Sequence, residues 1–178
     1  MMTAIKSDRL RQRFQIWDAD KNGRVDRADH EAEALRIIRA FGETTDSPRG
    51  AAVLDAYLHM YDFLAVSAGV GDDGMTEDQF VAVMESEMYG KGDSGFGKVL
   101  RPTIRASVDL CDTDGDGEIN RAEYRRWLEA IGLDQSKADE AFRRMDTDGR
   151  GRLTADLLVR AVKDFYYGEP DLPLLGGR

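Results

Sequence analysis

Acidic side chains alternate along a short stretch in the second half of the chain. Asp112, Asp114 and Asp116 occupy every second position, Gly117 follows, and Glu123 closes the stretch. Alternate residues of a tight loop can aim their carboxylates at one point, and a glycine permits the sharp turn that such a loop requires. Calcium is a hard cation that takes about six to eight oxygen ligands. The spacing therefore predicts a calcium site.

Residues 112–123 match the EF-hand calcium loop at every ligand position. In that pattern Glu118 contributes its backbone carbonyl, Asn120 holds a bridging water, and Glu123 offers both carboxylate oxygens from the first turn of the next helix. The alternative is an acidic surface turn. The metal site is favoured because the ligand types, the glycine, the apolar Ile119 and the closing glutamate all fall in register.

An earlier segment, residues 18–29, repeats this pattern with one departure. Asp18, Asp20 and Asn22 take the side-chain ligand positions, and Arg24 offers a backbone carbonyl. Asp29 stands where a glutamate is usual, and its side chain is one methylene shorter. It would draw the following helix inward or bind through a single oxygen, and a smaller shell favours magnesium, which prefers octahedral geometry. We expect a metal site here at which Mg²⁺ competes with Ca²⁺.

A third acidic segment, residues 146–157, lacks two decisive ligands. Arg150 places a positive charge at a ligand position, and Leu157 replaces the closing acid. Asp146, Asp148 and the Arg152 carbonyl would hold at most a weak, partly hydrated ion. The rival interpretation is that Arg150 pairs with Asp146 or Asp148 as an internal cation. We therefore expect two calcium ions per chain.

A fourth loop is located by Met75 and Thr76, which take the apolar and polar places of the repeat. Counting back from them puts Ala68 and Val70 where two aspartates belong, and Gln79 stands at the closing position. The pattern predicts a solvated turn without metal.

The elements that position these loops are helices. Apolar residues recur at helical spacing almost throughout, as at Leu10, Phe14 and Trp17, and strand-like alternation is nearly absent. Eight amphipathic segments joined in pairs by the four loops predict an all-α fold of four EF-hand helix-loop-helix units in two paired lobes. Glycines are frequent in residues 90–97 and oppose helix there. The predicted parts are an N-terminal pair at 1–89, a linker at 90–97, a C-terminal pair at 98–167 and a tail at 168–178.

EF-hands pack in pairs through a short two-stranded contact between their loops. This contact would set residues 24–26 against 74–76, and residues 118–120 against 152–154. The two degraded loops are then structural partners of the two intact ones, because their removal would expose apolar faces.

The chain resembles the calerythrin family, the bacterial relatives of the sarcoplasmic calcium-binding proteins, over essentially its whole length. The segments that carry the resemblance are residues 7–10, 27–29, 68–71, 76–80 and 162–165. The resemblance implies a compact four-unit fold with metal in the first, third and fourth loops. Arg150 and Leu157 depart from the family pattern in the fourth loop.

Composition restricts the remaining classes of function. The net charge of −9 and a pI near 4.8 repel polyanions, so we expect no nucleic-acid partner. The longest apolar runs are shorter than the ~20 residues of a membrane span, and the N-terminal residues lack the apolar stretch of a secretory signal. We expect a cytoplasmic, monomeric protein without membrane association.

Nothing in the sequence pairs a nucleophile with a base, so we expect no enzyme. His30 and His59 lie far apart in the sequence, and we expect His30 to be a partly packed helix residue. Cys111 ends an apolar stripe, so we expect it to lie in the core. Trp17 and Trp127 flank the two intact loops and should pack within the lobes. Related photoproteins hold a chromophore in aromatic-lined cavities, so ligand binding stays open.

Two functions fit the four-loop pattern. One is a cytosolic calcium buffer or modulator of calcium signals. The other is a sensor that exposes an apolar groove to a target protein helix. The internal methionines are scattered, whereas a promiscuous groove would gather them. Residues 169–175 could also fill such a groove from within the chain.

Overall fold

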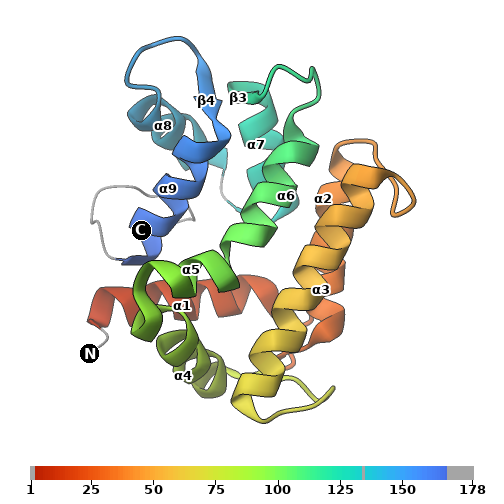
Figure 1. Ribbon diagram of the computed structural model, residues 1–178, viewed down its shortest axis with the longest axis vertical. Coiled ribbons are helices and arrows are strands. Elements are labelled where there is room, and N and C mark those ends of the chain that lie inside the picture. The colour runs from red at the N-terminus through yellow and green to blue at the C-terminus, as the bar shows by residue number, and fades with distance from the viewer. Residues whose placement is uncertain (1–2, 134, 168–178) are drawn as a thin grey trace.

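The computed structural model describes residues 3–133 and 135–167 (Figure 1). The first half contains α1 (Ala4–Trp17), β1 (Arg24–Val25), α2 (Arg27–Ala40), α3 (Pro48–Ala68), β2 (Met75–Thr76) and α4 (Glu77–Glu87). The second half contains the 3₁₀ turn η1 (Tyr89–Lys91), α5 (Gly92–Val99), α6 (Arg101–Cys111), β3 (Glu118–Asn120), α7 (Arg121–Ala130), α8 (Gln135–Met145), β4 (Arg152–Thr154) and α9 (Ala155–Tyr167). The all-α prediction is confirmed. The predicted tail lies outside the described residues.

Local sequence signals explain where the long helix α3 begins and ends. Ser47 caps its N-terminus by accepting a hydrogen bond from the Gly50 amide at 3.1 Å, and Pro48 occupies the first helical position. Gly69 ends the helix in a left-handed conformation with φ of 70°, which is unfavourable for residues that carry a side chain.

Two short antiparallel ladders join the loops in the predicted register. Val25 stands opposite Met75 between β1 and β2, and Ile119 stands opposite Leu153 between β3 and β4. All four side chains are fully buried, so each ladder is anchored by an apolar pair beneath it. The pairing of an intact loop with a degraded loop in each half is confirmed.

The glycine-rich segment differs from its prediction. Residues 92–99 form the helix α5 instead of a non-helical linker. Phe96 and Val99 are buried in the common core and hold this helix in place. Gly95 lies so close to the preceding turn that an added Cβ would be 2.3 Å from the Met88 carbonyl oxygen. Glycine at this position therefore permits close packing.

The two halves share one hydrophobic core. α2 packs on α7, α3 on α6, and α1 on α9, as Figure 1 shows for α3 beside α6. Hydrogen bonds also cross between the halves: Arg36 Nε donates to the Ala130 carbonyl at 3.1 Å, and Arg49 Nη1 donates to the Asp112 carbonyl at 2.8 Å. Division of the chain into two lobes at residues 89 and 98 remains a proposal.

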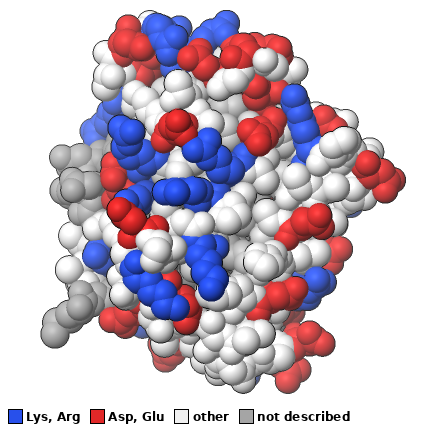
Figure 2. All heavy atoms as spheres, viewed as in Figure 1, with Lys and Arg blue, Asp and Glu red and all other residues white. Residues whose placement is uncertain are grey.

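Among the described residues, no helix combines the length and the apolar character needed to cross a membrane. Charged side chains are unevenly spread over the visible face of the molecule. On the face in Figure 2, basic side chains gather across the middle with acidic side chains among and around them.

Candidate metal centres

The third loop brings three carboxylates together. One oxygen from each of Asp112, Asp114 and Asp116 lies within 4.8 Å of the others. The backbone amide of Asp116 donates to Asp112 Oδ1 and to Asp114 Oδ1, each at 3.2 Å, and the Gly117 amide donates to Asp112 Oδ2 at 2.9 Å. These amides hold the carboxylates close together in spite of their mutual repulsion.

Glu123, the closing residue of this loop, is buried and bound at both oxygens. Oε2 accepts from the Asn120 amide at 3.0 Å, and Oε1 accepts from the Thr113 amide at 3.1 Å. The Asn120 side chain in turn caps α7 by accepting from the Glu123 amide. With the Glu118 carbonyl, the loop offers hard oxygen donors only, as calcium prefers. This donor set fits Ca²⁺.

In the first loop, backbone amides bind the ligand side chains at the first, second and third ligand positions as they do in the third loop. The Asn22 amide donates to Asp18 Oδ1 at 3.0 Å and to Asp20 Oδ1 at 3.1 Å, and the Gly23 amide donates to Asp18 Oδ2 at 3.0 Å. The Arg24 amide donates to Asn22 Oδ1 at 2.8 Å. The same backbone scaffold therefore organises both candidate sites.

Asp29 closes the first loop from the start of α2. Its Oδ2 accepts from the Asp26 amide at 3.0 Å, and Asp26 caps the helix reciprocally. Burial raises the pKa of Asp29 to about 6, and the like charges of Asp26, Asp20 and Asp18 act in the same direction. The hydrogen bond from the Asp26 backbone amide acts in the opposite direction and lowers the pKa. A cation at the loop would offset the repulsion among these carboxylates.

The fourth loop keeps the backbone form but fills its ligand position with an arginine. Arg150 Nε donates to Asp148 Oδ2 at 2.7 Å, and this hydrogen bond is the largest contribution that lowers the pKa of Asp148. Of the two partners that the sequence proposes for Arg150, Asp148 is the one observed. Asp146 Oδ2 instead accepts from the Gly151 amide at 2.8 Å, and Asp146 Oδ1 is buried without a hydrogen-bond partner in the described chain.

Two contacts between the third and fourth loops were missed by sequence reasoning. Arg150 Nη2 donates to Glu118 Oε1 at 2.9 Å, and Arg152 Nη1 pairs with Asp116 Oδ2. The predicted ladder was the signal that could have found them, because it sets Arg152 opposite Asn120 and near the third loop.

The second loop lacks the metal ligands but retains the hydrogen bonds that cap the following helix, α4. α3 continues through Ala68, where the first ligand would stand. The Thr76 amide donates to Gln79 Oε1 at 2.9 Å, and Thr76 Oγ1 accepts from the Gln79 amide at 3.3 Å. Gln79 thus reproduces the capping role of Glu123 without its charge.

His30 is more deeply buried than the sequence predicts. Its ring is fully buried, stacks on Trp17 with centroids 4.4 Å apart, and directs Nδ1 to the Asp26 carbonyl at 3.1 Å. Burial lowers the pKa of His30 to about 4. Cys111 is fully buried, in agreement with its predicted core role, and burial raises the pKa of its thiol.

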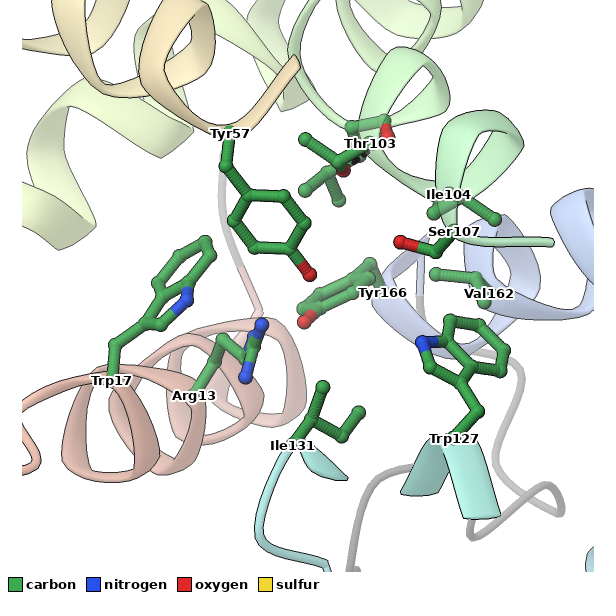
Figure 3. Close-up of a pocket in the computed structure, with 11 residues that line it drawn as sticks. Arg13, Trp17, Tyr57, Thr103, Ile104, Ser107, Trp127, Ile131, Val162 and Tyr166 are labelled. Carbon is green, nitrogen blue, oxygen red and sulfur yellow. Dashed lines mark hydrogen bonds between the residues drawn. The ribbon is translucent and has the colours of Figure 1, made fainter. Parts of the chain in front are cut away.

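An aromatic-lined cavity of about 50 Å³ lies between α1, α3, α6, α7 and α9 (Figure 3). The Tyr57 and Tyr166 hydroxyls and the Arg13 guanidinium point toward one another in it. Arg13 Nη1 also donates to Glu33 Oε1 at 2.9 Å, and Trp17 Nε1 donates to Glu33 Oε2 at 2.8 Å. Small-molecule pockets usually measure about 300–1,000 Å³. This cavity has room for one or two water molecules, at about 30 Å³ for each.

Comparison with known proteins agrees with the loop geometry. A family model described as EF hand matches residues 109–128, which include the third loop. Calerythrin of Saccharopolyspora erythraea is 44% identical over 177 residues, covering 99% of this chain and 100% of that protein. The chain belongs to the calerythrin family.

Further relatives of this calerythrin family member are also calcium-binding proteins. A sarcoplasmic calcium-binding protein of Perinereis vancaurica tetradentata is 29% identical, with 93% of this chain and 91% of that protein covered. The solved structure of a Streptomyces coelicolor calcium-binding protein matches with a TM-score of 0.77 and 31% identity, covering 90% of this chain and 97% of the other. The chain is thus a calcium-binding EF-hand protein, related to the sarcoplasmic calcium-binding proteins.

Proposed function

We propose that the chain binds two calcium ions, one in the first loop and one in the third, and acts as a cytoplasmic calcium buffer or modulator of calcium signals. The observation that carries this proposal is the shared hydrogen-bond scaffold, in which backbone amides gather the ligands of both loops. The ligands are Asp18, Asp20, Asn22, the Arg24 carbonyl, Asp29, Asp112, Asp114, Asp116, the Glu118 carbonyl and Glu123.

The buffer role is supported by how completely the apolar surface is covered. Among the described residues, Ile5 and Val66 are the exposed large hydrophobic side chains. A sensor that recruits a helix needs a contiguous apolar groove, and buffers of the EF-hand class open little on binding metal. The helices of the two halves instead pack against each other.

A sensor role is the second candidate, favoured by one comparison. The related Streptomyces coelicolor protein is described in terms of prokaryotic calcium-mediated regulation. In this chain such a role would require calcium to separate the packed halves or to open one EF-hand pair, and a target protein helix would then occupy the exposed face.

Calorimetric titration with Ca²⁺ and with Mg²⁺ tests the proposed sites. We expect two calcium ions per chain in the wild type, magnesium competition at the first loop, and loss of one site in Glu123→Gln, which removes the charge of the closing ligand. An unchanged isotherm for Glu123→Gln would show that the third loop is not the site. A third tight site would show that the fourth loop recruits oxygens beyond Asp146, Asp148 and the Arg152 carbonyl.

Fluorescence of an apolar dye separates buffer from sensor. A buffer should give the same low signal with and without calcium, whereas a sensor should bind the dye when calcium is added. Sedimentation under the same conditions tests the proposed monomer. The proposal assigns the chain no catalytic residue and no nucleic-acid or membrane partner.

A further inference from the structure

The fourth loop extends two arginine side chains toward the third loop. Arg152 Nη1 lies against Asp116 Oδ2, and Arg150 Nη2 donates to Glu118 Oε1 at 2.9 Å. Pairing of β4 with β3 fixes where both side chains start, since Arg152 stands opposite Asn120. The upper edge of the face in Figure 2, where β3 and β4 lie in Figure 1, shows basic and acidic side chains next to each other.

The two arginines contact chemically different parts of the third loop. Asp116 belongs to the carboxylate cluster that surrounds the candidate metal position. Glu118 would serve the metal through its backbone carbonyl, so its side chain is not a ligand. Arg152 therefore holds an oxygen of a ligand residue, whereas Arg150 holds a carboxylate outside the ligand set.

We propose that Arg152 is a resident counter-ion of the third loop, which calcium must displace from Asp116, and that this contact sets the calcium affinity of the site. The inference rests on the proposed function, namely that the third loop holds calcium. Without metal, the guanidinium neutralises one carboxylate of the cluster and reduces its self-repulsion. When metal arrives, the same positive charge opposes it and one ion pair is broken.

The displaced contact is weak enough to allow binding. The Arg152 side chain is 46% exposed and that of Asp116 is 27% exposed, so water screens the pair. Removing Arg152 should consequently raise the calcium affinity of the third loop by about three- to tenfold. It should also lower the melting temperature of the calcium-free protein, because the carboxylates lose their counter-ion. Removing a residue that merely supports the fold would instead lower both the calcium affinity and the melting temperature.

The test compares calcium titrations and melting curves in EDTA for matched variants. Arg152→Gln removes the charge that contacts a ligand residue, and Arg150→Gln removes an equal charge from the same loop. Arg105→Gln removes an arginine of equal exposure, 46%, that pairs with Asp156 on α9. We expect the full gain in affinity only for Arg152→Gln, a smaller gain for Arg150→Gln, and less than a twofold change for Arg105→Gln. Arg152→Lys should fall between Arg152→Gln and the wild type.

Two outcomes would overturn the inference. One is an equal gain in affinity for Arg152→Gln and Arg150→Gln, which would assign the effect to net charge. The other is a loss of affinity in Arg152→Gln together with a lower melting temperature, which would assign a structural role. Glu123→Gln tests the proposed function separately. If the third loop does not bind calcium, Glu123→Gln leaves the isotherm unchanged; if only the role of Arg152 is wrong, Glu123→Gln still loses one site.

Discussion

The closing residues of the first and third loops differ by one methylene group. Asp29 and Glu123 both stand at the third position of a helix, both are buried, and both accept a hydrogen bond from the amide of the capping residue. Their carboxylates therefore start from equivalent backbone positions. Any difference in metal preference between the loops at this position comes from the reach of the side chain.

Asp29→Glu should shift the first loop from magnesium toward calcium. The longer side chain can offer both oxygens and complete the larger shell that calcium prefers. We expect the ratio of calcium to magnesium affinity to rise about tenfold, which corresponds to about 1.4 kcal/mol. Competition calorimetry measures this ratio. Glu123→Asp is the matched variant and should shift the third loop from calcium toward magnesium. If each loop kept its wild-type ratio of calcium to magnesium affinity in Asp29→Glu and Glu123→Asp, the argument from side-chain length would be refuted.

His30 should make the calcium-free protein less stable in mild acid. The pKa of His30 falls from 6.5 to about 4 on folding because the ring is buried. Between these values the unfolded chain binds the proton and the folded chain does not, so stability is complete above pH 6.5 and falls as the pH drops toward 4. The loss should reach about 3 kcal/mol.

Urea unfolding in EDTA at several pH values measures this effect. In His30→Phe the loss between pH 7 and pH 4 should be smaller than in the wild type by that amount. His59→Gln, on the exposed side of α3, should follow the wild-type profile. Asp29 titrates in the same range with the opposite sign, but it is common to all three proteins and cancels in the comparison. Parallel profiles for wild type and His30→Phe would contradict the prediction.

At the scale of elements, glycine has two different roles within α5. A Cβ on Gly95 would lie 2.3 Å from the Met88 carbonyl oxygen and 2.6 Å from that of Glu87. A Cβ on Gly97 would meet only the flexible Arg101 side chain, at 3.7 Å. The first glycine permits close packing, and the second simply weakens the helix.

Alanine substitutions should therefore act in opposite directions. Gly95→Ala should lower the free energy of unfolding by about 1–3 kcal/mol, because the backbone must move apart. Gly97→Ala should raise it by about 0.5–1 kcal/mol through higher helix propensity. Thermal or urea unfolding checks both. If both variants were stabilised, the close approach at Gly95 would not matter energetically.

The same segment shows what the sequence could and could not predict. Helix-loop-helix units and ladder register follow from local patterns, which is why Val25 stands opposite Met75 and Ile119 opposite Leu153, as predicted. The helicity of residues 92–99 depends on tertiary contacts of Phe96, which override glycine propensity. The Arg152–Asp116 pair was missed for a related reason: a loop pattern specifies positions within one loop but not which side chains reach across a ladder.

At the scale of the whole molecule, calcium should stabilise the fold. Only the folded loops gather the ligands, and two divalent ions take the net charge from −9 to −9 + 4 = −5. At a hundredfold excess over the dissociation constant, each site should add about 2.7 kcal/mol. The melting temperature should then rise by about 10 °C or more. Calorimetry at increasing calcium, with an EDTA baseline, measures the shift; a constant melting temperature at millimolar calcium would contradict metal binding to the folded loops.

The shared core gives the two candidate sites a physical connection. Arg49 at the start of α3 donates to the carbonyl of Asp112, the first ligand residue of the third loop. Arg13 of α1 and Glu33 of α2 form a buried ion pair beside the cavity that α6, α7 and α9 also line. A change in the position of α6 on metal binding would therefore alter its contacts with α3 in the first half.

Cys111 offers a native position at which the frequency of such movements can be measured, without an engineered cysteine. It is the single cysteine of the chain, its side chain is fully buried, and it immediately precedes Asp112. Alkylating reagents attack the thiolate and need access to the sulfur. Native protein should thus be modified only during excursions that detach the end of α6, and the modification rate reports how often these occur. Oxidants need the same access, so metal that binds only the closed loop would make these openings rarer and slow oxidation of the thiol.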